Sequence, residues 1–198
     1  MSALQEPASD LLFTIDDLSA MPDDGKRYEI IEGELYVSTQ PNWHHQYACT
    51  SLLWALENWG KETGLGVANG APGVIFSIHD AVAPDVVWVS FERLSQILGE
   101  DGKLHAAPDL AVEVISPGRP NEQRDRGAKL KLYSRRGVRE YWIVDWQTRQ
   151  VEVYRRSQTQ LAHIATLLHE DELTSPLLPG VSCKVSTLFM QIPPAPKA

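Results

Sequence analysis

The sequence predicts a mixed α/β (α+β) fold, a β-sheet with helices packed on it, and two observations support this prediction. First, three apolar runs bounded by Pro, Gly and Ser have the composition of buried strands, at 81–89, 109–115 and 141–145. Second, a helical pattern at 121–136 separates the last two of these runs. Strands that alternate with helices form mixed or parallel sheets covered by helices.

The remaining elements follow from local patterns along the chain. Thr14 to Asp17 has the form of a capping box, and Glu32-Gly33 marks the turn of a hairpin. Gly137 ends the helix at 121–136. The other elements that we expect are a helix at 14–20, hairpin strands at 27–31 and 34–38, a helix at 43–62, strands near 67 and at 73–78, a short helix at 90–97, strands at 150–154 and 161–168, and a loop at 176–181.

Length and composition indicate one globular domain without a membrane span. The chain has 198 residues, of which 43% are hydrophobic and 22% charged. No apolar run is long enough to cross a bilayer, and the first residues lack the features of a signal peptide, so we expect a cytoplasmic protein. We expect the domain to cover 13–190, between a disordered N-terminus (1–12) and a Pro-rich tail (191–198). Cys49 and Cys183 form no paired motif, which favours reduced structural thiols.

The charge is unevenly distributed along the chain. The net charge is −8, which argues against loose binding to nucleic acid. The segment 119–139 has eight positive and two negative side chains, a net +6, and the remainder of the chain therefore carries −14. A basic helix on an acidic body fits local docking of a phosphate backbone, with Arg124, Arg126 and Arg135 as the contacting residues. The alternative is an ordinary solvated helix face, which is what most charge runs are.

Two carboxylates lie where a core is expected. Asp85 and Glu113 sit inside otherwise apolar strands. A buried carboxylate needs a cationic partner or a metal ion, because burial without one is costly.

The helix at 121–136 supplies a cation on its apolar face. With about 100° per residue, Lys129 falls between Leu132 and Tyr133 on the apolar arc, and Lys131 falls on the opposite face. One interpretation is that Lys129 extends along the sheet and pairs with Asp125 four residues earlier. The other is that Lys129 points at Asp85 and Glu113.

Two carboxylates and a lysine suit a divalent metal ion and a phosphodiester. The carboxylates would bind Mg²⁺ or Mn²⁺, the metal would activate water, and the lysine would stabilise developing charge. Two further residues have ordinary structural positions by the pattern alone. Glu29 has the position of a surface strand residue, and His45, next to His44, stands at the start of a helix, where histidines usually occur without a metal.

The ordered series of motifs resembles the Uma-type family of endonucleases, within the PD-(D/E)XK, restriction-endonuclease-like superfamily. The resemblance extends from about Phe13 to Phe189, and no single motif in it is specific. The matching pieces are Tyr28-Glu29-Ile30-Ile31-Glu32-Gly33-Glu34-Leu35, His45-Gln46, Pro84-Asp85-Val86, Pro108-Asp109-Leu110-Ala111-Val112-Glu113-Val114-Ile115-Ser116-Pro117, Lys129, Tyr133 and Gly137-Val138-Arg139-Glu140-Tyr141-Trp142-Ile143-Val144-Asp145.

The resemblance implies a restriction-endonuclease-like core with extra N-terminal and C-terminal β-hairpins. It assigns Asp85 and Glu113 as metal ligands and Lys129 as the catalytic lysine, and Glu29 and His45 match family positions as well. The chain departs from the general superfamily pattern at Ile115, where a lysine is expected two residues after Glu113. Lys129 on the following helix would replace that lysine.

Two functions follow as expectations. The first is a Mg²⁺- or Mn²⁺-dependent endonuclease that hydrolyses DNA, with a homodimer as the candidate assembly. The second is an inactive module that keeps the fold for dimerisation or nucleic-acid docking, which the acidic remainder of the chain favours. Cleavage of plasmid DNA that depends on a metal ion distinguishes them.

Overall fold

The computed structural model describes residues 12–191. The expected disordered N-terminus (1–12) and Pro-rich tail (191–198) fall almost wholly outside these residues. None of the helices in the described range is long and apolar enough to cross a membrane.

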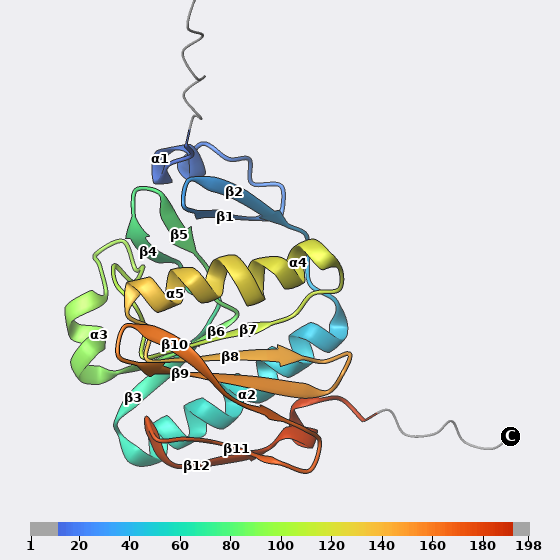
Figure 1. Ribbon diagram of the computed structural model, residues 1–198. Helices are drawn as coiled ribbons and strands as arrows, with labels where there is room; N and C mark the ends of the chain where they lie inside the picture. Colours follow the sequence, from blue (N-terminus) through green and yellow to red (C-terminus); the bar gives the residue numbers. More distant parts are fainter. Residues whose placement is uncertain (1–11, 192–198) are drawn as a thin grey trace, which may run out of the picture.

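A six-stranded mixed sheet forms the centre of the molecule, as Figure 1 shows. Only its two central strands run parallel, and the helical segment between them makes the crossover that such a pair requires. The other pairs are antiparallel. In sheet order the strands are β10 (Gln160–Leu167), β9 (Gln150–Ser157), β8 (Glu140–Asp145), β7 (Leu110–Val114), β6 (Val86–Ser90) and β3 (Gly66–Gly70).

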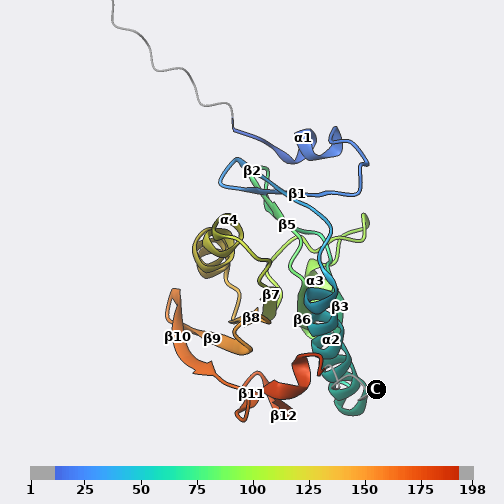
Figure 2. The same ribbon diagram turned by 90° about the vertical axis from the view of Figure 1, so that its right-hand side faces the viewer.

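Helices cover both faces of this sheet, and Figure 2 shows them on opposite sides of β6, β7 and β8. Alternate residues of each strand point to opposite faces, so the sheet has two cores. On one face α2 (Trp43–Thr63) packs against Val86, Trp88 and Val112. The other face packs against a continuous run made of α4 (Arg119–Gln123), the π-helix η1 (Arg124–Lys129) and α5 (Leu130–Arg136).

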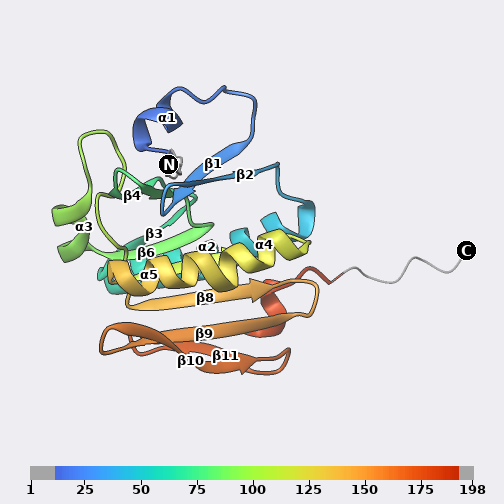
Figure 3. The same ribbon diagram turned by 45° about the horizontal axis from the view of Figure 1, so that its top comes forward.

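A second sheet stands at one end of the first, seen most clearly in Figure 3. The hairpin turns at Glu32 and Gly33, both with positive φ, which is the geometry of a tight two-residue turn. The predicted capping box at Thr14 and Asp17 is present. The elements here are α1 (Ile15–Ser19), β1 (Arg27–Ile31), β2 (Glu34–Ser38), β4 (Val74–Ser77) and β5 (Asp80–Val82).

The expectation of one strand over 81–89 is wrong. The chain forms β5 in the small sheet, leaves it at Ala83, and enters the large sheet as β6 from Val86. Pro84 has no N–H to donate to a ladder, which suits a break between two sheets. Asp85 therefore lies at the end of a strand, between the two sheets, and not inside one.

The expected C-terminal β-hairpin is present, but part of it lies in a segment that we expected to be a loop. The segment 176–181 was expected to be a loop, yet Leu178 begins a strand that pairs with the one before it. Pro179 is tolerated because this sheet has only two strands and both are edges. The remaining elements are α3 (Phe91–Ile97), β11 (Glu172–Ser175), β12 (Leu178–Lys184) and the 3₁₀ turn η2 (Val185–Leu188).

Candidate active site

The break between β5 and β6 brings polar side chains from several elements together. The backbone there joins neither ladder, so side chains provide the hydrogen-bond partners of its N–H and C=O groups. Ala83 N–H donates to Glu29 Oε1 at 2.8 Å, and Arg27 Nη1 donates to the Ala83 carbonyl at 3.2 Å. Arg27 and Glu29 are two residues apart on β1 and thus face the same side.

Asp85 is buried, with both carboxylate oxygens engaged. Arg27 Nη1 lies 3.0 Å from Oδ1, while His45 Nε2 at 3.2 Å and the Val114 N–H at 2.9 Å approach Oδ2. Burial by itself raises the pKa of Asp85. The hydrogen bond and charge of His45, and then the charges of Lys129 and Arg27, outweigh burial and hold this pKa well below its ordinary value.

Glu113 lies beside Asp85 on the neighbouring strand. The register pairs Val86 with Val112, so the next step along both strands sets Asp85 opposite Glu113. The Tyr133 hydroxyl donates to Glu113 Oε1 at 2.7 Å, and no hydrogen bond from a described residue reaches Oε2. Burial, reinforced by the neighbouring carboxylates, raises the pKa of Glu113 to about 8 even though the charge of Lys129 opposes the shift.

Lys129 is fully buried between two carboxylates. Its Nζ lies 2.9 Å from Glu29 Oε1 and 2.9 Å from Glu113 Oε1. Burial by itself lowers the pKa of Lys129, but the charges of Glu113 and Glu29 outweigh it and raise this pKa above the ordinary value. Neither contact has the angles of a hydrogen bond, so the ammonium protons have no aligned acceptor among the described residues.

The sequence-based pairing of Lys129 is therefore half right. Glu113 is a partner as expected, but the second partner is Glu29 and not Asp85. Glu29 is 1% exposed, so the expectation of a surface strand residue is wrong. The alternative pairing with Asp125 is also absent from the ion pairs of the described residues, because Asp125 Oδ1 accepts from Arg124 Nε at 2.9 Å.

A π-helical stretch, η1, carries both Asp125 and Lys129 to the buried side. A π-helix has more residues per turn than an α-helix, and such insertions often occur at functional sites. Both side chains are 0% exposed. Asp125 Oδ2 has no hydrogen-bond partner among the described residues, and burial raises the pKa of this carboxyl. The wheel placed Lys129 correctly because its neighbours Leu132 and Tyr133 belong to the regular helix α5.

His45 enters the site from the first turn of α2, where Asn42 caps the helix by accepting from the His45 N–H. Its two ring nitrogens face different groups. Nδ1 lies 3.5 Å from Cys49 Sγ, and Nε2 faces Asp85. These three residues could be taken for a metal site, since their ligand atoms lie within 4.8 Å of one another. In this structure the ring lies between the two residues, with Nδ1 toward Cys49 and Nε2 toward Asp85.

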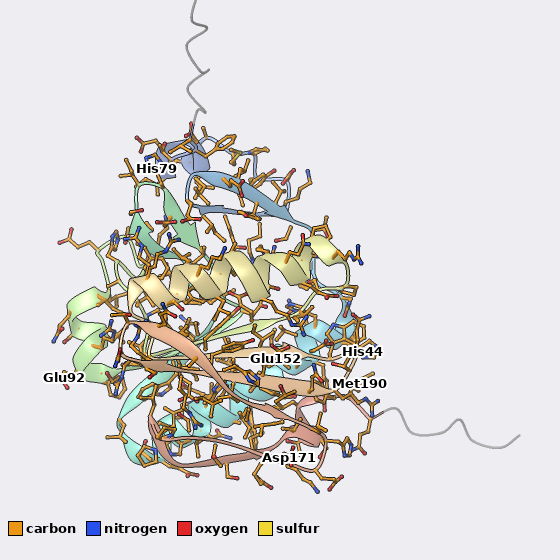
Figure 4. All side chains as sticks on the ribbon, viewed as in Figure 1. His44, His79, Glu92, Glu152, Asp171 and Met190 are labelled. Atoms are coloured by element: carbon orange, nitrogen blue, oxygen red, sulfur yellow. The ribbon has the colours of Figure 1, made fainter. Side chains whose placement is uncertain are left out.

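His44, by contrast, lies outside the site. Its ring stacks on Trp146 with centroids 4.9 Å apart. Figure 4 shows His44 beside Met190, and both residues line a separate small pocket. The neighbouring histidines thus point to different parts of the molecule.

A polar pocket of about 250 Å³ opens onto Asp85. Arg27, His45, Ser116 and Arg124 are among its lining residues. The pocket has room for a phosphate group, and cationic side chains stand on two sides of it.

The three arginines that we expected to contact nucleic acid all have carboxylate partners. Arg124 pairs with Asp125 and lies 4.0 Å from Glu29. Arg126 contacts Glu152, Asp145 and Glu122, and Arg135 pairs with Glu32. Of the three, only Arg124 lines the pocket. The net charge of +6 in this segment is therefore largely balanced by neighbouring elements.

Sequence reasoning missed Arg27, considered Asp125 only as a partner of Lys129, and noted Tyr133 only as a matching position without a role. A signal for Arg27 was available, since a strand places Arg27 and Glu29 on one face. For Asp125 and Tyr133 the sequence offered only their place on the helix, because neither their burial nor their partners can be read from spacing.

Stability of the metal-free protein is expected to fall as pH rises through the range in which Glu113 loses its proton. The pKa of this carboxyl is raised from the ordinary 4.5 to about 8. The folded state therefore binds the proton more tightly than the unfolded state does. The stability that this proton contributes is fully present below about pH 4.5 and lost by about pH 8. Between these values the free energy of unfolding falls with a slope on the order of 1 kcal/mol per pH unit for one proton. Urea unfolding in EDTA at several pH values measures this slope.

Glu113→Gln is the matched control for this measurement. The amide cannot ionise, so the variant should lose this slope between pH 5 and 8 while other groups continue to titrate. Identical pH profiles of wild type and Glu113→Gln would contradict a raised pKa at this position.

The fold and the site together define a class of protein. A mixed sheet with a helical crossover, and acidic residues with a lysine at the ends of its central strands, is the arrangement of a restriction-endonuclease-like core. Residues 15–186 match the model of the Uma2 family, described as "Putative restriction endonuclease". The chain belongs to this family.

A solved structure has the same fold. It is a protein from Anabaena variabilis ATCC 29413, described as a putative nuclease belonging to DUF820, with a TM-score of 0.72 and 20% identity. The match covers 89% of this chain and 97% of that one. No curated protein matches the chain.

Proposed function

We propose that this protein is a metal-dependent endonuclease that hydrolyses phosphodiester bonds of DNA. The observation that carries the proposal is the fully buried Lys129, 2.9 Å from both Glu29 and Glu113, beside the carboxylate of Asp85. Burying so many charged groups is costly and needs a compensating role. Strongly perturbed titratable groups next to a pocket are typical of active sites.

The donor set fits a hard divalent cation. Asp85 and Glu113 would bind Mg²⁺ or Mn²⁺ through oxygen, the ligand type that these ions prefer. Glu113 Oε2, which accepts no hydrogen bond within the described residues, and Asp85 Oδ1, which Arg27 Nη1 covers at 3.0 Å, are the candidate ligand atoms. When bound, the ion would lower the pKa of a water molecule and neutralise charge on the phosphate.

The chain's own residues would orient the two metal ligands and stabilise the charge that develops during the reaction. Lys129 would place its positive charge near the phosphate oxygens, whose negative charge grows as the phosphorus becomes pentacoordinate, and its position between two carboxylates holds the ammonium in place. Tyr133 would hold Glu113 in one orientation through the 2.7 Å hydrogen bond to Oε1. His45 would do the same for Asp85 through Oδ2, as groups that hydrogen-bond to metal ligands commonly do.

Cleavage of supercoiled plasmid DNA tests the proposal. We expect nicked and linear products with Mg²⁺ or Mn²⁺ and none with EDTA. The same preparation carrying Asp85→Asn should give no product, which excludes a contaminating nuclease. Intact plasmid with every divalent ion, together with DNA binding, would favour the alternative of an inactive docking module.

DNA affinity should depend on salt through the basic helix. Replacing Arg124, Arg126 and Arg135 with Gln is expected to flatten the plot of log affinity against log salt, because each lost phosphate contact removes about 0.9 from the slope on duplex DNA. Each arginine has to exchange a carboxylate for a phosphate, so the loss should be less than three contacts. Fluorescence anisotropy in Ca²⁺ measures it. An unchanged slope would exclude phosphate contact by this helix.

A further inference from the structure

Asp85 has one oxygen that buried groups contact and one that a partly exposed group covers. Oδ2 accepts from the Val114 backbone and faces His45 Nε2, and both of these partners are buried. Oδ1 is covered by Arg27 Nη1 at 3.0 Å. A metal ion that binds Asp85 from the pocket must therefore take the position of the Arg27 guanidinium.

Arg27 is more exposed than the other two cations of the site, Arg124 and Lys129. Its side chain is 32% exposed, whereas that of Lys129 is 0% exposed. It also stands between two hollows, the 250 Å³ pocket at Asp85 and a second one of about 420 Å³ beside α1, and lines both. Rotation about its side-chain bonds can carry the guanidinium from Asp85 into open space on either side.

The charges of the site are nearly balanced with Arg27 in place. Three cations, Arg27, Arg124 and Lys129, face four carboxylates, those of Glu29, Asp85, Glu113 and Asp125. A divalent cation added to this set introduces excess positive charge. Departure of one resident cation removes part of that excess.

We propose that Arg27 is an exchangeable cation: it covers Asp85 Oδ1 in the metal-free protein, gives up this oxygen to the metal ion, and then contacts a phosphate of the substrate in the pocket. The inference rests on the proposed nuclease function for the identity of the substrate. Arg124 cannot take this part, because its partners are Asp125 and Glu29 and it makes no ion pair with Asp85. A guanidinium suits the second step, since it binds phosphate oxygens in pairs.

Replacing Arg27 with Met tests the exchange. The variant removes the competitor for Asp85, so Mn²⁺ should bind at least about tenfold tighter by calorimetry, the scale of one lost charge–charge interaction at a part-buried site. Duplex DNA in Ca²⁺ should bind more weakly. Mn²⁺ affinity equal to or below that of wild type would overturn the exchange, and unchanged DNA affinity would overturn the phosphate contact.

Arg139→Met is the matched control. Arg139 also pairs with a buried aspartate at 3.0 Å, Asp109, but at the opposite end of β7. The same substitution there should leave Mn²⁺ affinity unchanged. A tenfold gain in both variants would mean that any lost cation has this effect and would overturn a specific part for Arg27.

A measurement on the wild-type protein covers the case in which Arg27→Met does not fold. Phenylglyoxal modifies accessible guanidinium groups, and mass spectrometry of peptides reports each arginine separately. Saturating Mn²⁺ should raise the modification rate of Arg27 several-fold and leave that of Arg139 unchanged. An unchanged rate at Arg27 would overturn the exchange.

Failure of this inference can be told from failure of the proposed function. Calorimetry and modification require metal binding but no turnover. If the protein shows both effects and cuts no DNA, the exchange holds and the nuclease assignment is wrong. If it cuts DNA and shows neither effect, the nuclease assignment holds and the exchange is wrong.

Discussion

Replacing Lys129 with Met is expected to reduce DNA cleavage by about a hundredfold or more, the scale seen when an active site loses one electrostatic donor. The substitution keeps most of the volume of the side chain and removes the charge that lies 2.9 Å from both Glu29 and Glu113. Initial rates of plasmid nicking under saturating Mn²⁺ measure the effect. Lys131→Met, on the exposed side of the same helix, should cost little.

The same substitution is also expected to destabilise the fold. Removing one member of a buried charge cluster costs about 3–5 kcal/mol, because Glu29 and Glu113 stay buried and lose the cation 2.9 Å away. Most domains have about 5–15 kcal/mol of stability, so the variant should still fold. Uptake of a proton by Glu113 would reduce the loss.

A double variant separates the catalytic contribution of Lys129 from the structural one. Glu29→Gln removes one of the carboxylates that Lys129→Met leaves unpaired, so the double variant should regain stability. Cleavage should stay at the level of Lys129→Met or fall below it. Recovery of both stability and cleavage would show that Lys129 is only a structural ion-pair partner. Equal activity of Lys129→Met and Lys131→Met would also exclude a catalytic contribution of Lys129.

Replacing Asp85 with Asn is expected to abolish detectable cleavage and to weaken Mn²⁺ binding at least tenfold to a hundredfold, since even indirect supports of a metal site contribute that much. The amide keeps the shape of the side chain but lacks the negative charge that a hard cation prefers. Calorimetry with Mn²⁺ measures the affinity without turnover. Thermal unfolding, compared with wild type, shows whether loss of the Arg27 pair also destabilises the fold.

Asp80→Asn is the control for this variant. Asp80 is also a buried aspartate that pairs with an arginine, Arg136, but it lies on β5 in the small sheet. The Asp80→Asn variant should keep the wild-type affinity for Mn²⁺ even if its stability falls. Equal Mn²⁺ affinity in wild type and Asp85→Asn would exclude Asp85 from the metal site.

Most of the secondary structure could be predicted because it depends on short-range features. Capping at Thr14, the turn at Glu32-Gly33 and the end of the helix at Gly137 each involve residues a few positions apart. The errors occurred where tertiary pairing decides. The run at 81–89 was predicted to be one strand, yet β5 and β6 divide it between two sheets because each pairs with a different set of partners.

The sequence by itself determined that two carboxylates and a lysine, Asp85, Glu113 and Lys129, would be buried. Asp85 and Glu113 stand in apolar runs and Lys129 lies on the apolar arc of a helix, and these are local properties of the sequence. It also determined the family, because the order of the motifs along the chain is sufficient for that.

Only the tertiary structure decided which of the charged groups meet. Glu29 and Lys129 are a hundred positions apart, and Arg27 reaches Asp85 from another sheet. No local pattern encodes these pairings, since they depend on how β1 docks against the end of the large sheet. The partners of the arginines on the helix were undetermined for the same reason. The packing of distant elements therefore placed Lys129 between Glu29 and Glu113 and left Asp85 to Arg27 and His45.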